Sequence, residues 1–329
     1  MKQLKRRELG HTGIMVSEMG LGCMSYGGHI SQAESFARMN DYLALGGNFF
    51  DTANIYGRSM DGTSQAGESE AIIGRWLKAN GKRSEIVLAS KVGFPYPGIE
   101  YGTTRAQIRA ECEKTLQRLQ TDYLDLYYLH TDDRNTPMEE SLEALQELIK
   151  EGKVRHIGAS NFSAWRLERS LAICREHGWE PFCCVQQRHS YLRPKQDSVF
   201  GQQKYVDLEM REFIKDTGLT LIAYCPLIKG AYVRDLGFPG QYVSEDSRIR
   251  LRTLKDIAKR SGISPNQLVY YWLMHSDPSA IPLMAASNEE QFREDVATLE
   301  VDASAYMEEL NQAADGHIGP EFRAREPME

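Results

Sequence analysis

Residues 124–159 read LDLYYLHTDDRNTPMEESLEALQELIKEGKVRHIGA, a strand-like run, a helix-like run and a second strand-like run. The two outer runs, residues 124–130 and 154–159, are short, apolar and rich in aromatic or β-branched residues, which is typical of buried strands. Between them, Thr136 and Glu139 have the spacing of a helix capping box, and leucines follow at helical spacing. Strands joined by a helix pair in parallel, so the stretch predicts one unit of a parallel α/β sheet.

The same alternation of strand and helix recurs along the whole chain. Eight strands that alternate with helices are the number that closes a (β/α)8 barrel, the TIM barrel. A doubly wound open sheet is the alternative, but it usually carries a G-x-G-x-x-G motif after its first strand. Residues 20–25 read GLGCMS instead, and we find no such motif elsewhere. The remaining strand-like runs are residues 18–22, 49–52, 86–91, 184–187, 220–224 and 280–283.

The two ends of the chain complete the expected architecture. Residues 9–14 read LGHTGI and predict a hairpin turn ahead of the first barrel strand. We expect this hairpin to close the bottom of the barrel, and the C-terminal helices and loops to lie at its mouth. Residues 1–329 are interpreted as a single domain. Residues 316–329 contain Gly, Pro and charges, and we interpret them as a tail that is either flexible or covers a neighbouring surface.

The composition is that of an ordinary globular protein, with 329 residues, 41% hydrophobic, 26% charged and a net charge of −7. It excludes a disordered chain, a collagen and a disulfide scaffold. The acidic balance argues against nucleic acid or an anionic membrane as the main partner. Because the chain shows no signal-like segment and no apolar run of about 18 residues, we expect a cytoplasmic protein. An oligomer is compatible with the sequence.

The 6 cysteines are scattered and none has the spacing of a metal-ligand motif, so the sequence predicts no metal site. We expect reduced thiols. Cys183 and Cys184 are adjacent at the start of a predicted strand. Because successive side chains of a strand alternate between its faces, we expect one of these thiols to face inward and the other outward.

Polar residues end several of the predicted strands, which is where barrel enzymes place their catalytic groups. Asp51 and Tyr56 lie at the end of the second strand, Lys91 at the end of the third and His130 at the end of the fourth. A free phenol has a pKa of about 10, and a nearby ammonium lowers it. We therefore expect Lys91, held by Asp51, to tune Tyr56 as the acid that protonates a developing alkoxide. His130 can donate to the same oxygen.

These side chains cannot deliver two electrons, so a nicotinamide cofactor must supply a hydride. Asn161 and Gln186 lie at the ends of the fifth and sixth strands and carry amides that can hold the carboxamide of nicotinamide. Tyr224, at the end of the seventh, offers a flat face for the ring. The set predicts the reduction of a carbonyl compound.

A series of short motifs carries a family resemblance over most of the chain, roughly from Leu9 to Asp295. With these motifs the sequence resembles the aldo-keto reductase family. They are Leu9-Gly10-x-Thr12-Gly13, Gly20-Leu21-Gly22, Asp51-Thr52-Ala53-x-x-Tyr56-Gly57, Ser69-Glu70, Ser90-Lys91, Leu129-His130-x-x-Asp133, residues 152–162 (GKVRHIGASNF) and Tyr224-x-Pro226-Leu227.

The resemblance implies a (β/α)8 barrel, NAD(P)(H)-dependent reduction of aldehydes or ketones, and a catalytic tetrad of Asp51, Tyr56, Lys91 and His130. It also implies contacts to the nicotinamide amide from Ser160, Asn161 and Gln186, and stacking of the ring on Tyr224. The cofactor-binding residues carried over are Gly22, Cys23, Met24, Asp51, Ser160, Asn161, Gln186, Tyr224, Pro226, Leu227, Lys229, Gly230, Ser287, Gln291, Glu294 and Asp295.

The sequence departs from the family pattern where the adenosine 2′-phosphate sits. Many members have a Gly and then a Lys or Arg after strand eight, but residues 281–288 read IPLMAASN and offer no cation. Gln291 and Glu294 match the adenine side of that motif better, and Lys229 can replace the missing cation from elsewhere. The resemblance thus favours NADP(H), and NAD(H) stays open.

The loops at the mouth set the substrate. Residues 58–67, 93–101, 131–136 and 229–247 form these loops, and the first is longer than expected for the family. Their polar and aromatic mix is compatible with a sugar or another hydroxylated carbonyl. Residues 187–191 (QRHSY) lack the aromatic residue expected soon after Gln186.

Two other functions fit parts of the pattern. One is a nucleotide-binding sensor or regulatory subunit of the same fold with slow turnover, like the cytoplasmic β-subunits of potassium channels. The other is a barrel lyase that uses Lys91 as a Schiff-base amine. Rapid multiple turnover of a carbonyl excludes the first, and nucleotide binding argues against the second.

Overall fold

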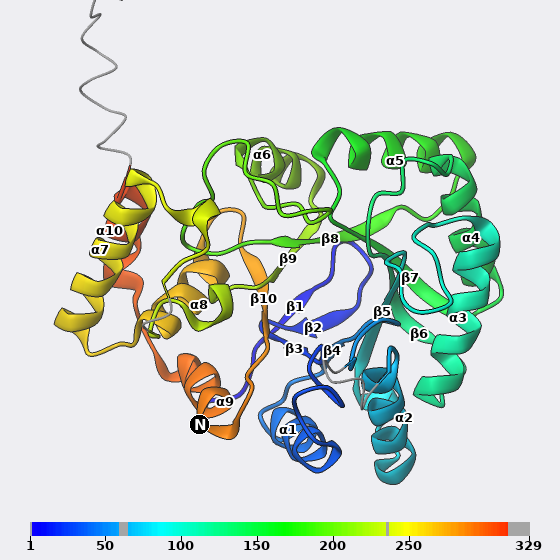
Figure 1. Cartoon of the computed structure of the whole chain (residues 1–329), viewed down its shortest axis with the longest axis horizontal. Helices are drawn as coiled ribbons and strands as arrows, with labels where there is room; N and C mark the ends of the chain where they lie inside the picture. Colours follow the sequence, from blue (N-terminus) through cyan, green and yellow to red (C-terminus); the bar gives the residue numbers. More distant parts are fainter. Residues whose placement is uncertain (1, 59–64, 235–236, 315–329) are drawn as a thin grey trace, which may run out of the picture.

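A computed structural model describes residues 2–58, 65–234 and 237–314. Its centre is a closed barrel of parallel strands in the order β10-β3-β4-β5-β6-β7-β8-β9 (Figure 1). The predicted (β/α)8 barrel is therefore confirmed, and the open doubly wound sheet is excluded. The barrel strands are β3 (Gly20–Gly22), β4 (Phe49–Asp51), β5 (Val87–Val92), β6 (Leu124–Leu129), β7 (Val154–Ser160), β8 (Phe182–Arg188), β9 (Thr220–Tyr224) and β10 (Ala280–Met284).

Helices surround the barrel, and a large apolar core fills the space between them and the outer face of the strands. In β4, for example, the ring of Phe50 stacks on Trp76 of the neighbouring helix with centroids 5.6 Å apart. The α-helices are α1 (Gln32–Ala44), α2 (Glu68–Asn80), α3 (Arg105–Leu119), α4 (Met138–Lys150), α5 (Ala164–His177), α6 (Leu208–Thr217), α7 (Glu245–Ser261), α8 (Pro265–His275), α9 (Glu289–Ala297) and α10 (Met307–Gln312). Short 3₁₀ helices are η1 (Arg83–Glu85), η2 (Ile228–Gly230), η3 (Gly240–Tyr242), η4 (Thr298–Glu300) and η5 (Ser304–Tyr306).

The start of α4 differs from the sequence prediction. Pro137 occupies the N-cap position, and no side chain caps the helix. The Thr136 hydroxyl instead donates to Asp133 Oδ2 at 2.6 Å. The predicted capping box is wrong because α4 begins at Met138 with Pro137 as its N-cap, one residue later than predicted, so Thr136 lies before the cap position.

An N-terminal hairpin closes the bottom of the barrel, as predicted. Strands β1 (Arg6–Glu8) and β2 (Met15–Ser17) pair antiparallel, and Leu9 and Val16 join the apolar cluster inside the barrel. The Gly10 amide donates to Thr220 Oγ1 of β9 at 2.7 Å. A Cβ on Gly10 would lie 2.4 Å from the carbonyl oxygen of Cys183, and its φ is +58°, so this close approach requires glycine.

The pairing of β7 with β8 contains an irregularity at the two cysteines. Ile157 pairs with Phe182 but Ala159 pairs with Val185, so β8 holds one more residue than β7 over this interval. Such a bulge disturbs the alternation of side chains. Cys183 and Cys184 both belong to the apolar cluster inside the barrel. The prediction of one inward and one outward thiol is therefore wrong, because the strand was assumed to be regular.

Some expectations about the chain ends and loops fall outside the described residues. Residues 316–329, the expected tail, and residues 59–64 of the long mouth loop are among them. At the other end, α10 follows α9 and contacts the segment after β8, where Tyr191 Oη donates to the Leu310 carbonyl at 3.0 Å. No helix in residues 2–58, 65–234 and 237–314 has the length and apolarity needed to span a membrane.

Candidate functional site

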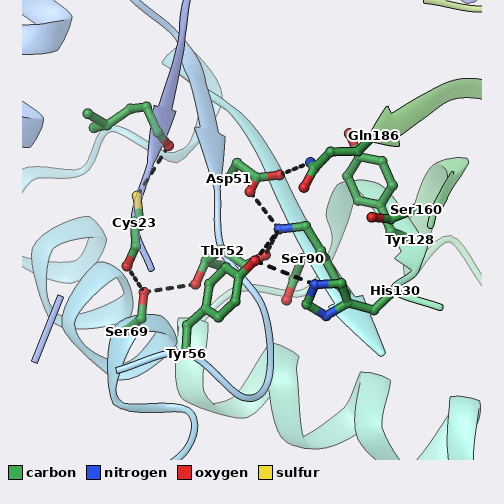
Figure 2. A network of polar contacts seen from close by, with 12 residues as sticks. Cys23, Asp51, Thr52, Tyr56, Ser69, Ser90, Tyr128, His130, Ser160 and Gln186 are labelled. Atoms are coloured by element: carbon green, nitrogen blue, oxygen red, sulfur yellow. Dashed lines mark hydrogen bonds and ion pairs between the residues drawn. The ribbon is translucent and has the colours of Figure 1, made fainter. Parts of the chain in front are cut away.

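The residues predicted to be catalytic come together inside the C-terminal end of the barrel (Figure 2). Successive side chains of a strand point to opposite faces of the barrel wall, which explains why these residues face inward. In β4, Phe49 belongs to the interior cluster and Phe50 packs outward, so Asp51 faces inward. In β5, the interior Ala89 lies two residues before Lys91. His130 immediately follows β6.

An ion pair forms the centre of the site. Lys91 Nζ lies 2.5 Å from Asp51 Oδ1 and donates to the Thr52 carbonyl at 2.7 Å. The second carboxylate oxygen of Asp51 accepts from Gln186 Nε2 at 2.8 Å. Lys91 is 0% exposed and Asp51 2%. Two buried charges persist because each has both its counter-charge and further hydrogen bonds.

Tyr56 is held on the loop between β4 and α2, over this ion pair. Its hydroxyl lies 3.5 Å from Lys91 Nζ and 3.5 Å from His130 Nε2. The turn that presents it requires Gly57, since φ there is +90° and a Cβ would lie 2.5 Å from the Ser69 amide nitrogen. The phenol thus faces an ammonium and an imidazole at once, as the sequence led us to expect.

Burial dominates the protonation of this group of residues. It raises the pKa of Asp51 and lowers that of Lys91, and in each case the partner's charge opposes the shift. The pKa of Tyr56 is raised well above its ordinary value, by burial first and by the negative charge of Asp51 second. The expected lowering of the Tyr56 pKa is therefore wrong for the site as it stands. The ammonium is already neutralised by Asp51, and a buried phenolate would lose its hydration.

His130 is a neutral imidazole in this site. Burial, followed by the positive charge of Lys91, lowers its pKa well below the ordinary value. Its Nδ1 atom is buried and has no hydrogen-bond partner in the part of the chain that the structure describes. The ring of Phe94 packs edge-on against it with centroids 4.6 Å apart. A neutral imidazole donates from one ring nitrogen only, and Nε2 is the nitrogen that lies 3.5 Å from the Tyr56 hydroxyl.

The amide of Asn161 is fully used by the protein itself. Its Nδ2 donates to the His130 carbonyl at 2.8 Å and to Ser160 Oγ at 3.1 Å. Its Oδ1 accepts from the Tyr224 hydroxyl at 2.7 Å and from the Lys204 amide at 3.1 Å. A side-chain amide has two donor hydrogens and two acceptor lone pairs, so a ligand that bonds to Asn161 must displace one of these contacts.

The surroundings of these polar groups fit a nicotinamide ring. Tyr224 is half-buried, and its hydroxyl joins Asn161 beside the Ser160 hydroxyl. A flat aromatic face next to hydroxyl and amide groups suits a planar ring that carries a carboxamide. The side-chain amide of Gln186 lies on the other side of the ion pair, where its Nε2 donates to Asp51 Oδ2.

The remaining cofactor residues expected near β3 and β9 lie at the rim of the same barrel end. Gly22 is half-buried, Cys23 is buried with its thiol directed at the Leu21 carbonyl, and Met24 is 56% exposed. After β9, Pro226 is buried, Leu227 and Gly230 are half-buried and Lys229 is exposed.

The residues expected to bind adenosine are only partly brought together. Ser287 is exposed, and its amide donates to Gln291 Oε1 at 2.8 Å. The Glu294 carboxylate instead accepts from Ser264 Oγ at 2.7 Å, at the start of α8. Asp295 is buried and bonded to Tyr270. Each of the two carboxylates thus already has a partner within the protein.

Three buried side chains support the site and were not predicted to be site residues, although Glu70 belongs to one of the family motifs. Glu70 of α2 accepts from Ser90 Oγ at 2.5 Å, and Glu111 of α3 accepts from Asn54 Nδ2 at 2.8 Å. Arg38 of α1 donates to the Ala286 carbonyl at 2.6 Å, beside the segment that lacks a cation. A signal was available for Glu111, which lies between the apolar Ile108 and Cys112 on the buried face of its helix.

The buried carboxyl of Asp295 predicts a pH dependence of stability. Burial raises its pKa to about 8 from 3.8. The folded chain therefore holds this proton at pH values where the unfolded chain has released it. The contribution to stability is full below pH 3.8 and is lost as pH rises through about 8. We expect Asp295→Asn to remove this dependence.

The measurement is the free energy of unfolding by urea at several pH values between these two limits. The slope that Asp295→Asn removes is at most about 1.4 kcal/mol per pH unit. Asp216→Asn, at an exposed position of α6, is the matched control and should keep the wild-type profile. Parallel profiles for wild type and Asp295→Asn would contradict the assignment.

A parallel barrel with a lysine–aspartate pair, a phenol and an imidazole inside its C-terminal end defines the class as a barrel oxidoreductase. A model of the Aldo/keto reductase family matches residues 18–314. The chain belongs to this family. It is an NAD(P)H-dependent oxidoreductase, and its family reduces carbonyl compounds with NADP(H) or NAD(H).

Curated relatives and a solved structure extend over nearly the whole chain. The oxidoreductase YrpG of Bacillus subtilis (strain 168) is 31% identical, over 89% of this chain and 90% of that protein. Norsolorinic acid reductase of Emericella nidulans is 30% identical, over 89% of this chain and 76% of that protein. A crystal structure of a thermostable aldo-keto reductase with the inhibitor epalrestat has a TM-score of 0.73 at 28% identity, and covers 94% of this chain and 100% of that one.

Proposed function

We propose that the chain reduces an aldehyde or ketone to the alcohol with Tyr56 as the proton donor. The observation that carries this proposal is the single phenol that lies 3.5 Å from both Lys91 Nζ and His130 Nε2. When bound, the nicotinamide cofactor supplies the hydride that reaches the carbonyl carbon. The carbonyl oxygen takes its proton from Tyr56, and the two transfers together give the alcohol.

Each of the other three side chains supports this proton transfer. Because the pKa of Tyr56 is high, the phenol is protonated before the reaction and loses its proton only to a stronger base such as an alkoxide. Lys91 donates to the phenol oxygen and stabilises the negative charge that forms there. Asp51 fixes the lysine, and the neutral His130 donates to and orients the carbonyl oxygen.

We propose a sugar or another hydroxylated carbonyl as the substrate. Phe94 and Tyr101 form an edge-on aromatic pair beside His130, with ring centroids 6.5 Å apart. Polar groups lie next to them, since Tyr101 Oη contacts Thr131 Oγ1 at 3.1 Å. Apolar faces with hydroxyls at their edges suit a molecule that is itself part apolar and part hydroxylated. Norsolorinic acid reductase and versiconal hemiacetal acetate reductase, the latter 28% identical, are among the relatives.

The experiment that tests the function is a titration of the full chain with NADPH and, separately, NADH. Binding is followed by tryptophan fluorescence. A panel of sugar, aliphatic and aromatic carbonyls is then screened with the nucleotide that binds, and its oxidation is measured. Binding with rapid multiple turnover supports the reductase. Binding without turnover favours the sensor, and absence of binding, with borohydride trapping of a carbonyl on Lys91, favours the lyase. We also propose that the chain works in the cytoplasm.

We propose NADP(H) as the cofactor, and the missing cation after β10 gives a test. Ser287 is exposed on the segment between β10 and α9. Ser287→Arg should increase the preference for NADPH over NADH by about tenfold, or about 1.4 kcal/mol, because an arginine can bond a phosphate at two oxygens. The ratio of the two dissociation constants measures this effect.

Ser287→Gln is the matched control, since it adds length and hydrogen bonding without charge. It should leave the NADPH to NADH ratio near that of the wild type. An unchanged ratio in Ser287→Arg would place the 2′-phosphate away from residue 287.

A further inference from the structure

The bulge in β8 places two thiols side by side inside the bottom of the barrel. Cys183 Sγ donates to Cys184 Sγ at 3.8 Å, and Cys184 Sγ donates to the Tyr128 hydroxyl at 3.6 Å. Gly158, across from them in β7, has no side chain, and a Cβ there would lie 2.9 Å from Cys184 Sγ. The pair therefore depends on both the bulge and this glycine.

The geometry of the pair is unsuited to a disulfide. A disulfide needs sulfurs about 2.05 Å apart and Cα atoms usually at least about 4.4 Å apart, whereas neighbouring residues joined by a trans peptide have Cα atoms about 3.8 Å apart. A single atom that bonds both sulfurs fits better. With bonds of about 2.3 Å, the length of a zinc–sulfur bond, such an atom spans two sulfurs 3.8 Å apart.

The described residues offer no complete set of ligands for a metal ion at this place. They contain no group of three or more histidine, cysteine, aspartate or glutamate side chains that could hold a metal. The bridging atom must therefore bring its own remaining substituent. A trivalent arsenic atom with one organic group has this requirement, because two thiols complete its three bonds.

A cavity of about 310 Å³ at the bottom of the barrel reaches Cys183, and Cys184 lies behind it. Cys183 lines it together with Gly10 and His11 of the hairpin turn, Leu171 of α5, and Pro181 and Gly218 at the starts of β8 and β9. His11, Pro181 and Gly218 are exposed, so the cavity communicates with solvent. Cys183 is 7% exposed and Cys184 0%.

We propose that Cys183 and Cys184 form a dithiol site that binds trivalent organoarsenicals through this cavity. With an organoarsenic dihydroxide, two As–O bonds break and two As–S bonds form. Each thiol proton leaves with one hydroxide as water, and arsenic remains trivalent, so no oxidant or reductant takes part. The organic group of the arsenical occupies the cavity between the hairpin and α5.

The raised pKa of Cys183 favours reaction with an arsenical over reaction with peroxides or alkylating agents. The pKa of Cys183 is raised well above its ordinary value, first by its hydrogen bond to Cys184 and then by burial. A thiol that is not ionised reacts slowly with peroxides and alkylating agents, which require the thiolate. The condensation with an arsenical converts two thiols and two hydroxides into two As–S bonds and water, so its product leaves no charge in the apolar interior for burial to oppose.

The experiment incubates the full chain with phenylarsine oxide and measures the intact mass under native conditions. We expect one phenylarsenic group per chain, which a dithiol such as 2,3-dimercaptopropanol removes and excess monothiol does not. Cys183→Ser and Cys184→Ser should each lose this adduct at least tenfold in occupancy. Cys225→Ser is the matched control and should retain it, since Cys225 is the half-buried cysteine outside the pair.

A second variant tests the route without touching either sulfur. Leu171→Trp fills the cavity wall on α5 and should slow the adduct at least tenfold at unchanged stoichiometry. An adduct that persists in Cys183→Ser or Cys184→Ser would overturn the proposal. Formation of the adduct on the wild-type chain only in urea would overturn it too. Circular dichroism confirms that the variants fold. Because the experiment measures the mass of the adduct, its result does not depend on whether the chain has the proposed reductase activity.

Discussion

Tyr56→Phe should lower kcat for carbonyl reduction by about 10²–10⁴-fold, the usual contribution of general acid catalysis. The substitution removes one oxygen and its proton, and phenylalanine keeps the ring on the loop after β4. The hydroxyl's contacts to Lys91 and His130 are both 3.5 Å long, so the fold should lose little when they go. Steady-state kinetics with the best carbonyl of the screen, alongside nucleotide binding, measures the effect. The dissociation constant of the nucleotide should stay near the wild-type value.

Tyr101→Phe is the matched control for this prediction. It removes a second phenol at the mouth, one that contacts Thr131 and the Asp132 carbonyl and not the ion pair. We expect it to change KM more than kcat. A Tyr56→Phe enzyme with kcat near wild type would assign the proton to another donor.

Lys91→Met should reduce both activity and stability. Activity falls by about 10²–10³-fold, because the phenolate that forms on Tyr56 loses a preorganised donor. The free energy of unfolding falls by about 3–5 kcal/mol, because Asp51 stays buried without the charge that lay 2.5 Å away. Urea unfolding and steady-state kinetics measure the two losses separately.

A double variant separates the two effects. In Asp51→Asn with Lys91→Met, the buried negative charge is gone, and the oxygen of the new asparagine can still accept from Gln186. We expect this pair of changes to recover most of the stability and none of the activity. Equal stability of the single and double variants would mean that Asp51 is protonated once Lys91 is removed.

The barrel was predictable because its signals are local and repeated. The run of residues 124–130 became β6 (Leu124–Leu129), and residues 220–224 became β9 without change. The inward position of Asp51 and Lys91 follows from the period of two along each strand. The closure of eight strands then brings these ends together, whatever the loops between them contain.

What sequence reasoning missed depends on contacts between distant segments. The bulge at Cys183 and Cys184 arises from how β8 registers against β7, and an isolated strand does not reveal its register. The raised pKa of Tyr56 depends on burial and on how completely Asp51 neutralises Lys91, which residue types alone do not give. The capping box at Thr136 failed for a local reason instead, because α4 begins one residue later than predicted and Thr136 lies before its N-cap.

The saturated amide of Asn161 has a consequence for calorimetry. It joins the carbonyl of His130, the hydroxyls of Ser160 and Tyr224, and the amide of Lys204. A carboxamide that binds there exchanges one hydrogen bond for another, and such an exchange has a small net free energy. Because the bond lost and the bond gained are of the same kind, their enthalpies also nearly cancel, and recognition at this junction contributes little heat of its own. The contacts would instead orient the ligand, because the groups that surround Asn161 come from several strand ends and fix where a carboxamide can bind.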